Sequence, residues 1–271
     1  MTGSASSPTT SRPAAPKRAN AKRRKKKAPG WVPDQHGAWF MVTVPALTGA
    51  LLAPSWTAIP LLLTWWLGYF TFFAASWWIR SRFREKHRPP VLVYGAMAAV
   101  AGVVTLLMRW ELLVWVPLFA PLVLIAVYEA WRRRPRSLLS GVSTVLAACL
   151  VLPVIAWAGD GLDAKAWTVA AVYAVYFLGT VPYVKTLIRE RGERDWFLGS
   201  VGYHVVAIVA AVVAAVLGVV HWAVVAVAVV ILARAWGMPV SGAKRDKPWT
   251  PKQVGMLEGL ITLFVAIAAL L

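Results

Sequence analysis

The sequence VGYHVVAIVAAVVAAVLGVVHWAVVAVAVVILA, residues 201–233, indicates the fold class more directly than any other part of the chain. Between His204 and Ala233 its only polar interruption is His221, and Gly218 nearby supplies a weak turn signal. As one helix of about 33 residues the stretch would be about 50 Å long, which is too long for the core of a bilayer without extreme tilt. It therefore predicts two short membrane spans that meet near residue 220.

Apolar runs of similar length alternate with short polar breaks from His36 to the end of the chain. A helical span needs about 20 apolar residues, with a range near 17–25. We therefore predict an all-α fold, a polytopic transmembrane helical bundle of about nine spans. The predicted spans are 36–54, 57–79, 90–108, 111–129, 138–157, 166–184, 198–218, 221–236 and 252–271.

The overall composition agrees with a membrane protein and excludes a water-soluble globular enzyme. Of the 271 residues, 59% are hydrophobic and only 15% are charged, the mean hydropathy is +0.62, and yet the net charge is +18. A soluble domain is roughly 45–50% apolar and about 25% charged. A nucleic-acid-binding protein can carry such a charge, but not on so apolar a body. We therefore do not expect a nucleic-acid partner.

The cations are concentrated in an N-terminal tail and in alternate loops. Residues 1–30 hold nine of the 29 Lys and Arg residues and almost no aliphatic side chains, which predicts a disordered basic tail ahead of a transmembrane domain at 31–271. If the tail is cytoplasmic, only Arg109 and Lys165 of the 29 cations fall on the outer side. The positive-inside rule therefore predicts a cytoplasmic N-terminus, an external C-terminus and contact with an anionic cytoplasmic leaflet.

Ionisable groups in or beside the spans are the candidates for a ligand site, since such groups are costly at membrane depth and mark a site by default. Each has a structural alternative, namely helix capping, a topogenic loop or a satisfied interhelical partner. No metal, nucleotide or hydrolase motif is present, Cys149 is the only cysteine, and the catalytic residues and cofactor remain unassigned. The candidate ligand-binding residues are Gln35, His36, Arg84, His87, Arg88, Tyr128, Glu129, Arg133, Lys185, Arg189, Glu190, Arg191, Glu193, Tyr203, His204 and Glu258.

Most of these residues are predicted to face the cytoplasm, where arginine side chains offer paired donors to a phosphate group. We therefore predict that the protein binds an anionic lipid or an isoprenoid-like phosphate in a cytoplasm-facing pocket. Two alternatives remain open: a prenyltransferase-like enzyme, and a transporter or accessory membrane component.

Five segments resemble the YwiC-like family of bacterial integral membrane proteins. They are PDQHGAW (33–39), HR (87–88), RRRPRSLLS (132–140), IRERG (188–192) and YH (203–204). The resemblance implies a multi-pass protein of the bacterial cytoplasmic (inner) membrane and supplies no activity.

A topology-level similarity to UbiA-type prenyltransferases rests on the nine spans and on the loops after spans two and six, here Arg80–Arg88 and Lys185–Asp195. That family implies an active site at the cytoplasmic face. Its chemistry needs two Asp-rich motifs, because Mg²⁺ bridges carboxylates and the diphosphate. The chain has no DxxxD motif, so we predict no metal site and expect Arg and Lys to bind a phosphate directly.

Overall fold

The computed structural model describes residues 30–33, 36–243 and 249–271, and leaves the side chain of His36 undescribed. The predicted basic tail, apart from Gly30, and the candidate residue Gln35 lie outside the described residues.

The described residues form nine α-helices and two short 3₁₀-helices, with no β-strand among them. Within this part of the chain, eight helical segments are long and apolar enough to cross a membrane, and α1, with 17 residues, is a shorter apolar helix. The predicted all-α transmembrane bundle is therefore confirmed. The elements are α1 His36–Leu52, α2 Ala58–Arg80, η1 Glu85–His87, α3 Arg88–Met108, η2 Trp110–Trp115, α4 Val116–Trp131, α5 Leu138–Ala158, α6 Ala164–Ile188, α7 Arg194–Val216, α8 Trp222–Ala243 and α9 Pro251–Leu270.

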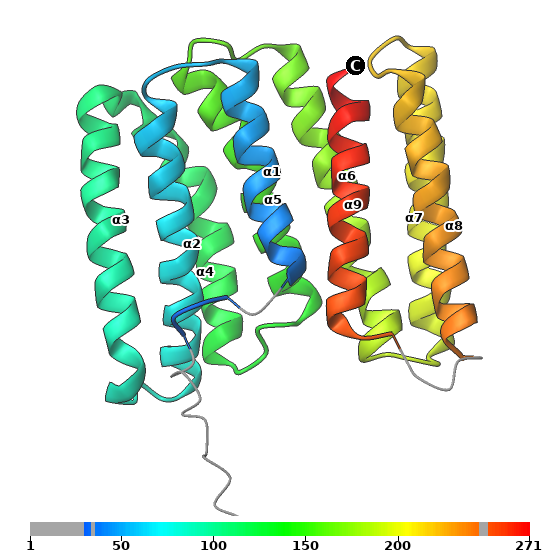
Figure 1. The fold of residues 1–271 in the computed structure, drawn as a ribbon, viewed down its shortest axis with the longest axis horizontal. Helices are drawn as coiled ribbons and strands as arrows, with labels where there is room; N and C mark the ends of the chain where they lie inside the picture. The colour runs from blue at the N-terminus through cyan, green and yellow to red at the C-terminus, as the bar shows by residue number, and fades with distance from the viewer. Residues whose placement is uncertain (1–29, 34–35, 244–248) are drawn as a thin grey trace, which may run out of the picture.

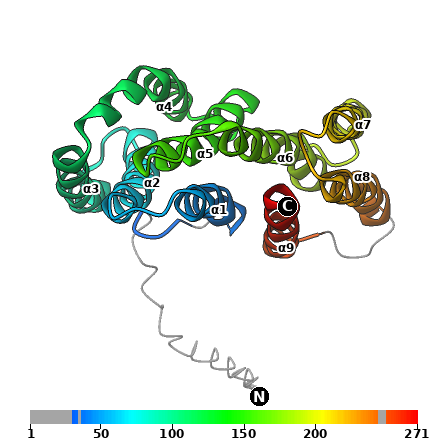
Figure 2. The same cartoon turned by 90° about the horizontal axis from the view of Figure 1, so that it is seen from above.

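The helices run side by side, with α5 and α6 in the middle of the bundle (Figure 1). Seen from above, α3 and α4 lie at one extreme and α7 and α8 at the other, while α1 and α9 lie on the same side of α5 and α6 (Figure 2). Apolar side chains of α5, α6 and α9 form the main core, in which Leu152, Val169 and Tyr173 are completely buried. The outer helices instead expose large apolar side chains such as Leu107 and Val206, as expected of surfaces that face lipid tails.

A turn separates α7 from α8, as the sequence predicts. Gly218 adopts a φ of +71°, in the left-handed region that glycine enters without strain, and this allows the chain to reverse between Val216 and Trp222. The predicted end of the next span at residue 236 is wrong, however, because α8 continues to Ala243. Arg234 therefore lies well inside α8, whereas in the predicted span it is only two residues from the end.

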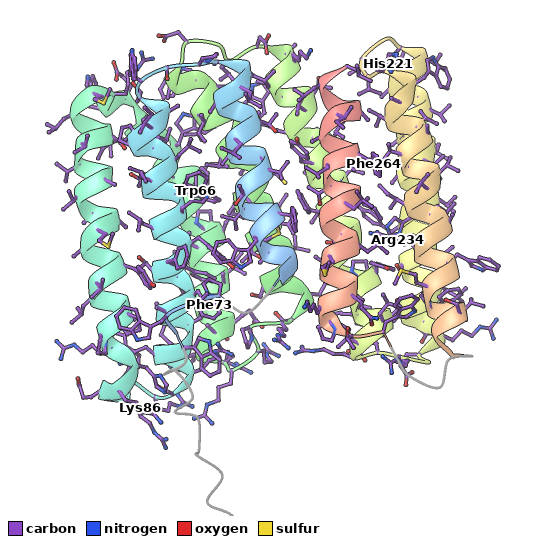
Figure 3. The ribbon with its side chains drawn as sticks, viewed as in Figure 1. Trp66, Phe73, Lys86, His221, Arg234 and Phe264 are labelled. Atoms are coloured by element: carbon purple, nitrogen blue, oxygen red, sulfur yellow. The ribbon has the colours of Figure 1, made fainter. Side chains whose placement is uncertain are left out.

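The basic connections of the chain gather at one end of the bundle. The connections 81–87, 132–137 and 189–193 lie at the lower end in Figure 1, and we call this end the basic end. The C-terminus and the connections 53–57, 159–163 and 217–221 lie at the opposite end. Figure 3 shows Lys86 at the basic end and His221 at the opposite end.

Candidate functional site

An ion pair between Arg234 of α8 and Glu258 of α9 is buried inside the bundle. Nη1 of Arg234 donates to Oε1 of Glu258, and the two residues are 7% and 6% exposed. In Figure 3, Arg234 lies between α8 and α9. Charges at this depth are costly unless they are paired, so each side chain stabilises the other in its place.

Two tyrosines of α6 complete the surroundings of the pair. The hydroxyl of Tyr176 lies 3.0 Å from Oε2 of Glu258 and 3.1 Å from Oγ1 of Thr262. The ring centre of Tyr183 lies 4.0 Å from Cζ of Arg234, a cation–π contact that stabilises a desolvated cation. Nε and Nη2 of Arg234 have no hydrogen-bond partner among the described residues. The guanidinium is therefore held by one carboxylate and one ring face.

A cavity of about 380 Å³ reaches this network from the basic end, between α1, α5, α6 and α9, and we call it the basic-end cavity. Glu258 and Thr262 line its depth. The cations that line it at the basic end are Arg136, Lys185 and Arg189, and the hydroxyl side chains that line it are Ser137, Thr144, Thr180 and Thr262.

The cations of the basic-end cavity form no ion pair with a carboxylate in the described part of the chain. Among the described residues, no ion pair involves Arg136, Lys185 or Arg189. Burial lowers the pKa of Arg189 and the positive charge of Arg136 lowers it further, whereas Glu190 raises it. Lys185 places its ammonium 4.2 Å from the ring centre of Trp196. The basic end of this cavity is therefore a place where positive charges lie close to one another, which favours an anion.

A second cavity, of about 270 Å³, lies between α6, α7, α8 and α9, and we call it the opposite-end cavity. Its lining includes Val219 and Val220 of the α7–α8 turn, and it reaches Tyr176 and His204. Most of the remaining lining is alanine and valine.

His204, which lines the opposite-end cavity, has one unpartnered ring nitrogen among the described residues. Its Nδ1 lies 2.7 Å from the carbonyl oxygen of Ser200, and because a carbonyl only accepts, Nδ1 carries the hydrogen. Nε2 is then an acceptor, and it has no partner among the described residues although His204 is only 3% exposed. Gly179 of α6 allows this approach, since a Cβ at that position would lie 2.9 Å from Nε2.

A third cavity, of about 560 Å³, lies among α1, α2, α3, α4 and α5. It shares the lining residues Ala38, Met41, Pro135 and Thr144 with the basic-end cavity, so the two cavities are neighbours.

The structure brings together only some of the candidate residues. Lys185, Arg189 and Glu258 share the basic-end cavity, whereas Tyr203 and His204 line the opposite-end cavity. Gln35 and the side chain of His36 lie outside the description. The exposed candidates, which line none of the three cavities, are Arg84, Arg88, Tyr128, Arg133, Arg191 and Glu193.

Three further candidate residues lie elsewhere in the protein, away from the cavities. Glu129 is 2% exposed and accepts a hydrogen bond of 3.1 Å from Arg134. His87 is buried and stacks against Trp77. Glu190 is half-buried on the α6–α7 connection. None of the three lines the cavities described above.

Sequence reasoning missed Arg234, Arg136 and Tyr176 as site residues. The signal for Arg234 was the sequence WGMPVSGA (236–243) after it, which is apolar enough to continue the helix. Tyr176 and Arg136 carried no such signal, because one is a tyrosine among apolar neighbours and the other is one of several arginines in a basic run.

The fold and the buried ion pair define a multi-pass α-helical membrane protein. The sequence profile described as YwiC-like protein matches residues 32–156, which run from just before α1 almost to the end of α5. The chain is 33% identical over 176 residues to "Uncharacterized protein YwiC" of Bacillus subtilis, covering 64% of this chain and 73% of that protein. It is 29% identical over 182 residues to "Uncharacterized protein" of Haemophilus influenzae, covering 64% and 74%. The chain therefore belongs to the YwiC-like family. No solved structure matches it, and these comparisons do not support the similarity to UbiA-type prenyltransferases.

Proposed function

We propose that this protein binds an anionic amphiphile, namely a phosphate-bearing lipid or an isoprenoid-like phosphate, in the basic-end cavity. The observation that carries the proposal is a group of three cations along one cavity, Arg136, Lys185 and Arg189, none of which forms an ion pair with a described carboxylate. Guanidinium groups donate two parallel hydrogen bonds to a phosphate, and an ammonium adds a point charge.

The dimensions of the cavity suit a ligand with a charged head and an apolar chain. Its volume of about 380 Å³ lies within the range of small-molecule sites, about 300–1,000 Å³. Between Pro251 and Thr262, both in its lining, α9 rises about 16 Å at 1.5 Å per residue. The head group would lie at the cations and the first part of the chain would extend inward, with the neighbouring 560 Å³ cavity available to a longer chain.

The basic end is the cytoplasmic end in this proposal, and the membrane is the bacterial cytoplasmic membrane. The positive-inside rule supports this orientation, because the loops 81–87, 132–137 and 189–193 share the basic end. An anionic lipid of the cytoplasmic leaflet would then have its head group at the depth of the three cations.

A prenyltransferase receives no comparable support. The carboxylates that would hold Mg²⁺ on the α6–α7 connection are Glu190 and Glu193, and the described residues contain no group of three or more His, Cys, Asp and Glu side chains suited to a metal ion.

The test is mass spectrometry of the phosphate-containing molecules retained by the protein after purification in mild detergent. The variant Lys185→Ala/Arg189→Ala removes two of the three cations. Each charge-assisted hydrogen bond contributes about 1.5–3 kcal/mol, so we expect at least about a tenfold loss of the retained ligand. The recovered mass separates a phospholipid, an isoprenoid phosphate and inorganic phosphate.

The matched control is Arg84→Ala/Arg133→Ala, which removes two exposed cations of the same end that line none of the cavities. The control should retain as much ligand as the wild type. Equal retention by both double variants would show that the basic-end cavity is not the binding site.

A further inference from the structure

Two cavities approach each other inside the bundle, and three polar side chains separate them. Glu258 and Thr262 line the basic-end cavity, and Tyr176 lines the opposite-end cavity. The Tyr176 hydroxyl lies 3.0 Å from Oε2 of Glu258 and 3.1 Å from Oγ1 of Thr262. A single hydrogen bond therefore joins a residue that lines one cavity to a residue that lines the other.

This contact lies near the middle of the membrane span. Tyr176 is midway along α6, Ala164–Ile188, so each end of that helix is about 18 Å away. The hydrocarbon core of a bilayer is about 30 Å thick. Each cavity therefore covers roughly half of the distance that a proton would have to cross.

We propose that Glu258 and Tyr176 form a proton path between the two cavities, so that the protein transfers protons across the membrane. This activity goes beyond binding of an anionic ligand in the basic-end cavity. It depends on groups that exchange protons, and a carboxylate hydrogen-bonded to a phenol is such a pair.

The transfer balances in both protons and charge. As Tyr176 passes its hydroxyl proton to Oε2 of Glu258, its oxygen takes a proton from a hydronium ion in the opposite-end cavity, and that hydronium becomes water. Glu258 then gives its proton to water in the basic-end cavity, which leaves as hydronium, and Glu258 is again a carboxylate beside Arg234. Rotation of the Tyr176 hydroxyl restores the starting hydrogen bond, and one proton has crossed.

Several charged groups surround Glu258. Arg234 from α8 donates to Oε1 of Glu258, which leaves the other carboxylate oxygen, Oε2, to the hydroxyl of Tyr176. From α6, Tyr183 lies against the guanidinium, and Lys185 and Arg189 line the basic-end cavity, as does Arg136 ahead of α5. These cations also oppose the entry of a free hydronium ion, so the path depends on transfer through Glu258 itself.

His204 of α7 provides independent support for water in the opposite-end cavity. His204 lines the same cavity as Tyr176, and its buried Nε2 has no hydrogen-bond partner among the described residues. A buried water needs two to four polar partners, and in a cavity otherwise lined mainly by alanine and valine the polar side chains of Thr168, Tyr176, Tyr203 and His204 are the ones available. Water beside Tyr176 delivers the proton that the path requires.

The test is proton flux into sealed liposomes that contain the purified full-length protein. A potassium diffusion potential set with valinomycin drives protons, and a pH-sensitive dye inside the vesicles reports their entry. We expect wild-type vesicles to exceed protein-free vesicles by at least about tenfold, and Tyr176→Phe to fall to the protein-free rate, because a positioned proton-transfer group contributes about 100-fold or more. Tyr176→Phe leaves the Arg234–Glu258 ion pair intact.

The matched control is Tyr173→Phe, on the same helix. Tyr173 is also buried, and its hydroxyl pairs with Thr48 at 2.8 Å, away from both cavities. The control should keep wild-type flux. A second variant, Arg234→Met/Glu258→Gln, removes both charges together and should fold but conduct no protons.

Two results would overturn the proposal: wild-type vesicles no faster than protein-free vesicles, or Tyr176→Phe as fast as Tyr173→Phe. Neither result bears on anionic-ligand binding, since Tyr176 does not line the basic-end cavity.

Discussion

Arg234 and Glu258 are 24 residues apart in the sequence and form an ion pair with both partners buried between α8 and α9. The pair ties together two helices whose connecting residues include 244–248, which lie outside the described part of the chain. It also places a carboxylate about two helical turns inside the bundle, at the depth of the basic-end cavity. Glu258 is therefore part of both the ion pair that stabilises the bundle and the proposed proton path.

Removal of one partner should destabilise the protein far more than removal of both. Arg234→Ala leaves Glu258 buried without its cation, and the expected loss is about 3 kcal/mol in the free energy of unfolding. Arg234→Met/Glu258→Met should lose much less, because the hydroxyl of Tyr176 still has Thr262 and the Glu258 backbone carbonyl as partners. Unfolding titrations in mixed micelles measure the free energy of unfolding of the single and the double variant. Equal losses in the single and double variants would contradict the importance of the pair.

Gly179 should be intolerant of a side chain, because α6 and α7 approach closely there. A Cβ at this position would lie 2.8 Å from Cε1 of Tyr203 and 2.9 Å from Nε2 of His204. Gly179→Ala should therefore lower the free energy of unfolding by about 1–3 kcal/mol. Gly202→Ala on α7 is the control, since nothing lies within 4 Å of its Cβ position, and it should be neutral or slightly stabilising. Thermal unfolding in detergent compares the two, and equal melting temperatures would refute the close approach.

The ion pair between Arg109 and Asp160 should make the opposite end of the bundle sensitive to acid. Two hydrogen bonds of 2.6 and 3.0 Å join the side chains. The hydrogen bond from Arg109 lowers the pKa of the Asp160 carboxyl below its usual value of 3.8. Because the pKa is lowered in the folded state, the ion pair contributes fully to the free energy of unfolding above the pKa of the unfolded chain. This contribution is lost as the pH falls through the folded-state pKa.

The corresponding measurement compares wild type with Asp160→Asn. Asparagine tolerates the positive φ of +58° at this position, so the backbone is little disturbed. The difference in melting temperature should be largest near pH 7 and should shrink as the pH falls below 3.8 and through the lowered pKa of the wild-type carboxyl. A difference that does not change with pH would show that the ion pair is not its cause.

The two ends of the bundle should react on opposite sides of the membrane. In labelling of intact cells with an impermeant thiol reagent, Glu111→Cys near η2 should react and Arg191→Cys on the α6–α7 connection should not, if the basic end is cytoplasmic. Cys149 is 2% exposed, so the parent chain serves as the unreactive background. Permeabilised cells provide the control, because both cysteines should then react. Labelling of Arg191→Cys in intact cells would reverse the predicted orientation.

The sequence by itself determined the membrane bundle, the number of helices and most of their limits. These follow from local properties: a run of about 20 apolar residues has to be a helix in a bilayer, and Gly218 permits the turn that divides residues 201–233. Glu258 also stood out locally, as a carboxylate within an apolar run.

Only the tertiary structure decided which of the polar residues meet. The sequence predicted one cytoplasm-facing pocket for most of the candidates, whereas the packing of α6 against α7 makes His204 line the opposite-end cavity. Arg234 was not among the candidates, and only the packing of α8 against α9 brings it to Glu258. The physical reason is that apolarity sets the length of a helix, but its rotation about its own axis, and therefore the partners of each polar side chain, depends on close packing with all neighbouring helices.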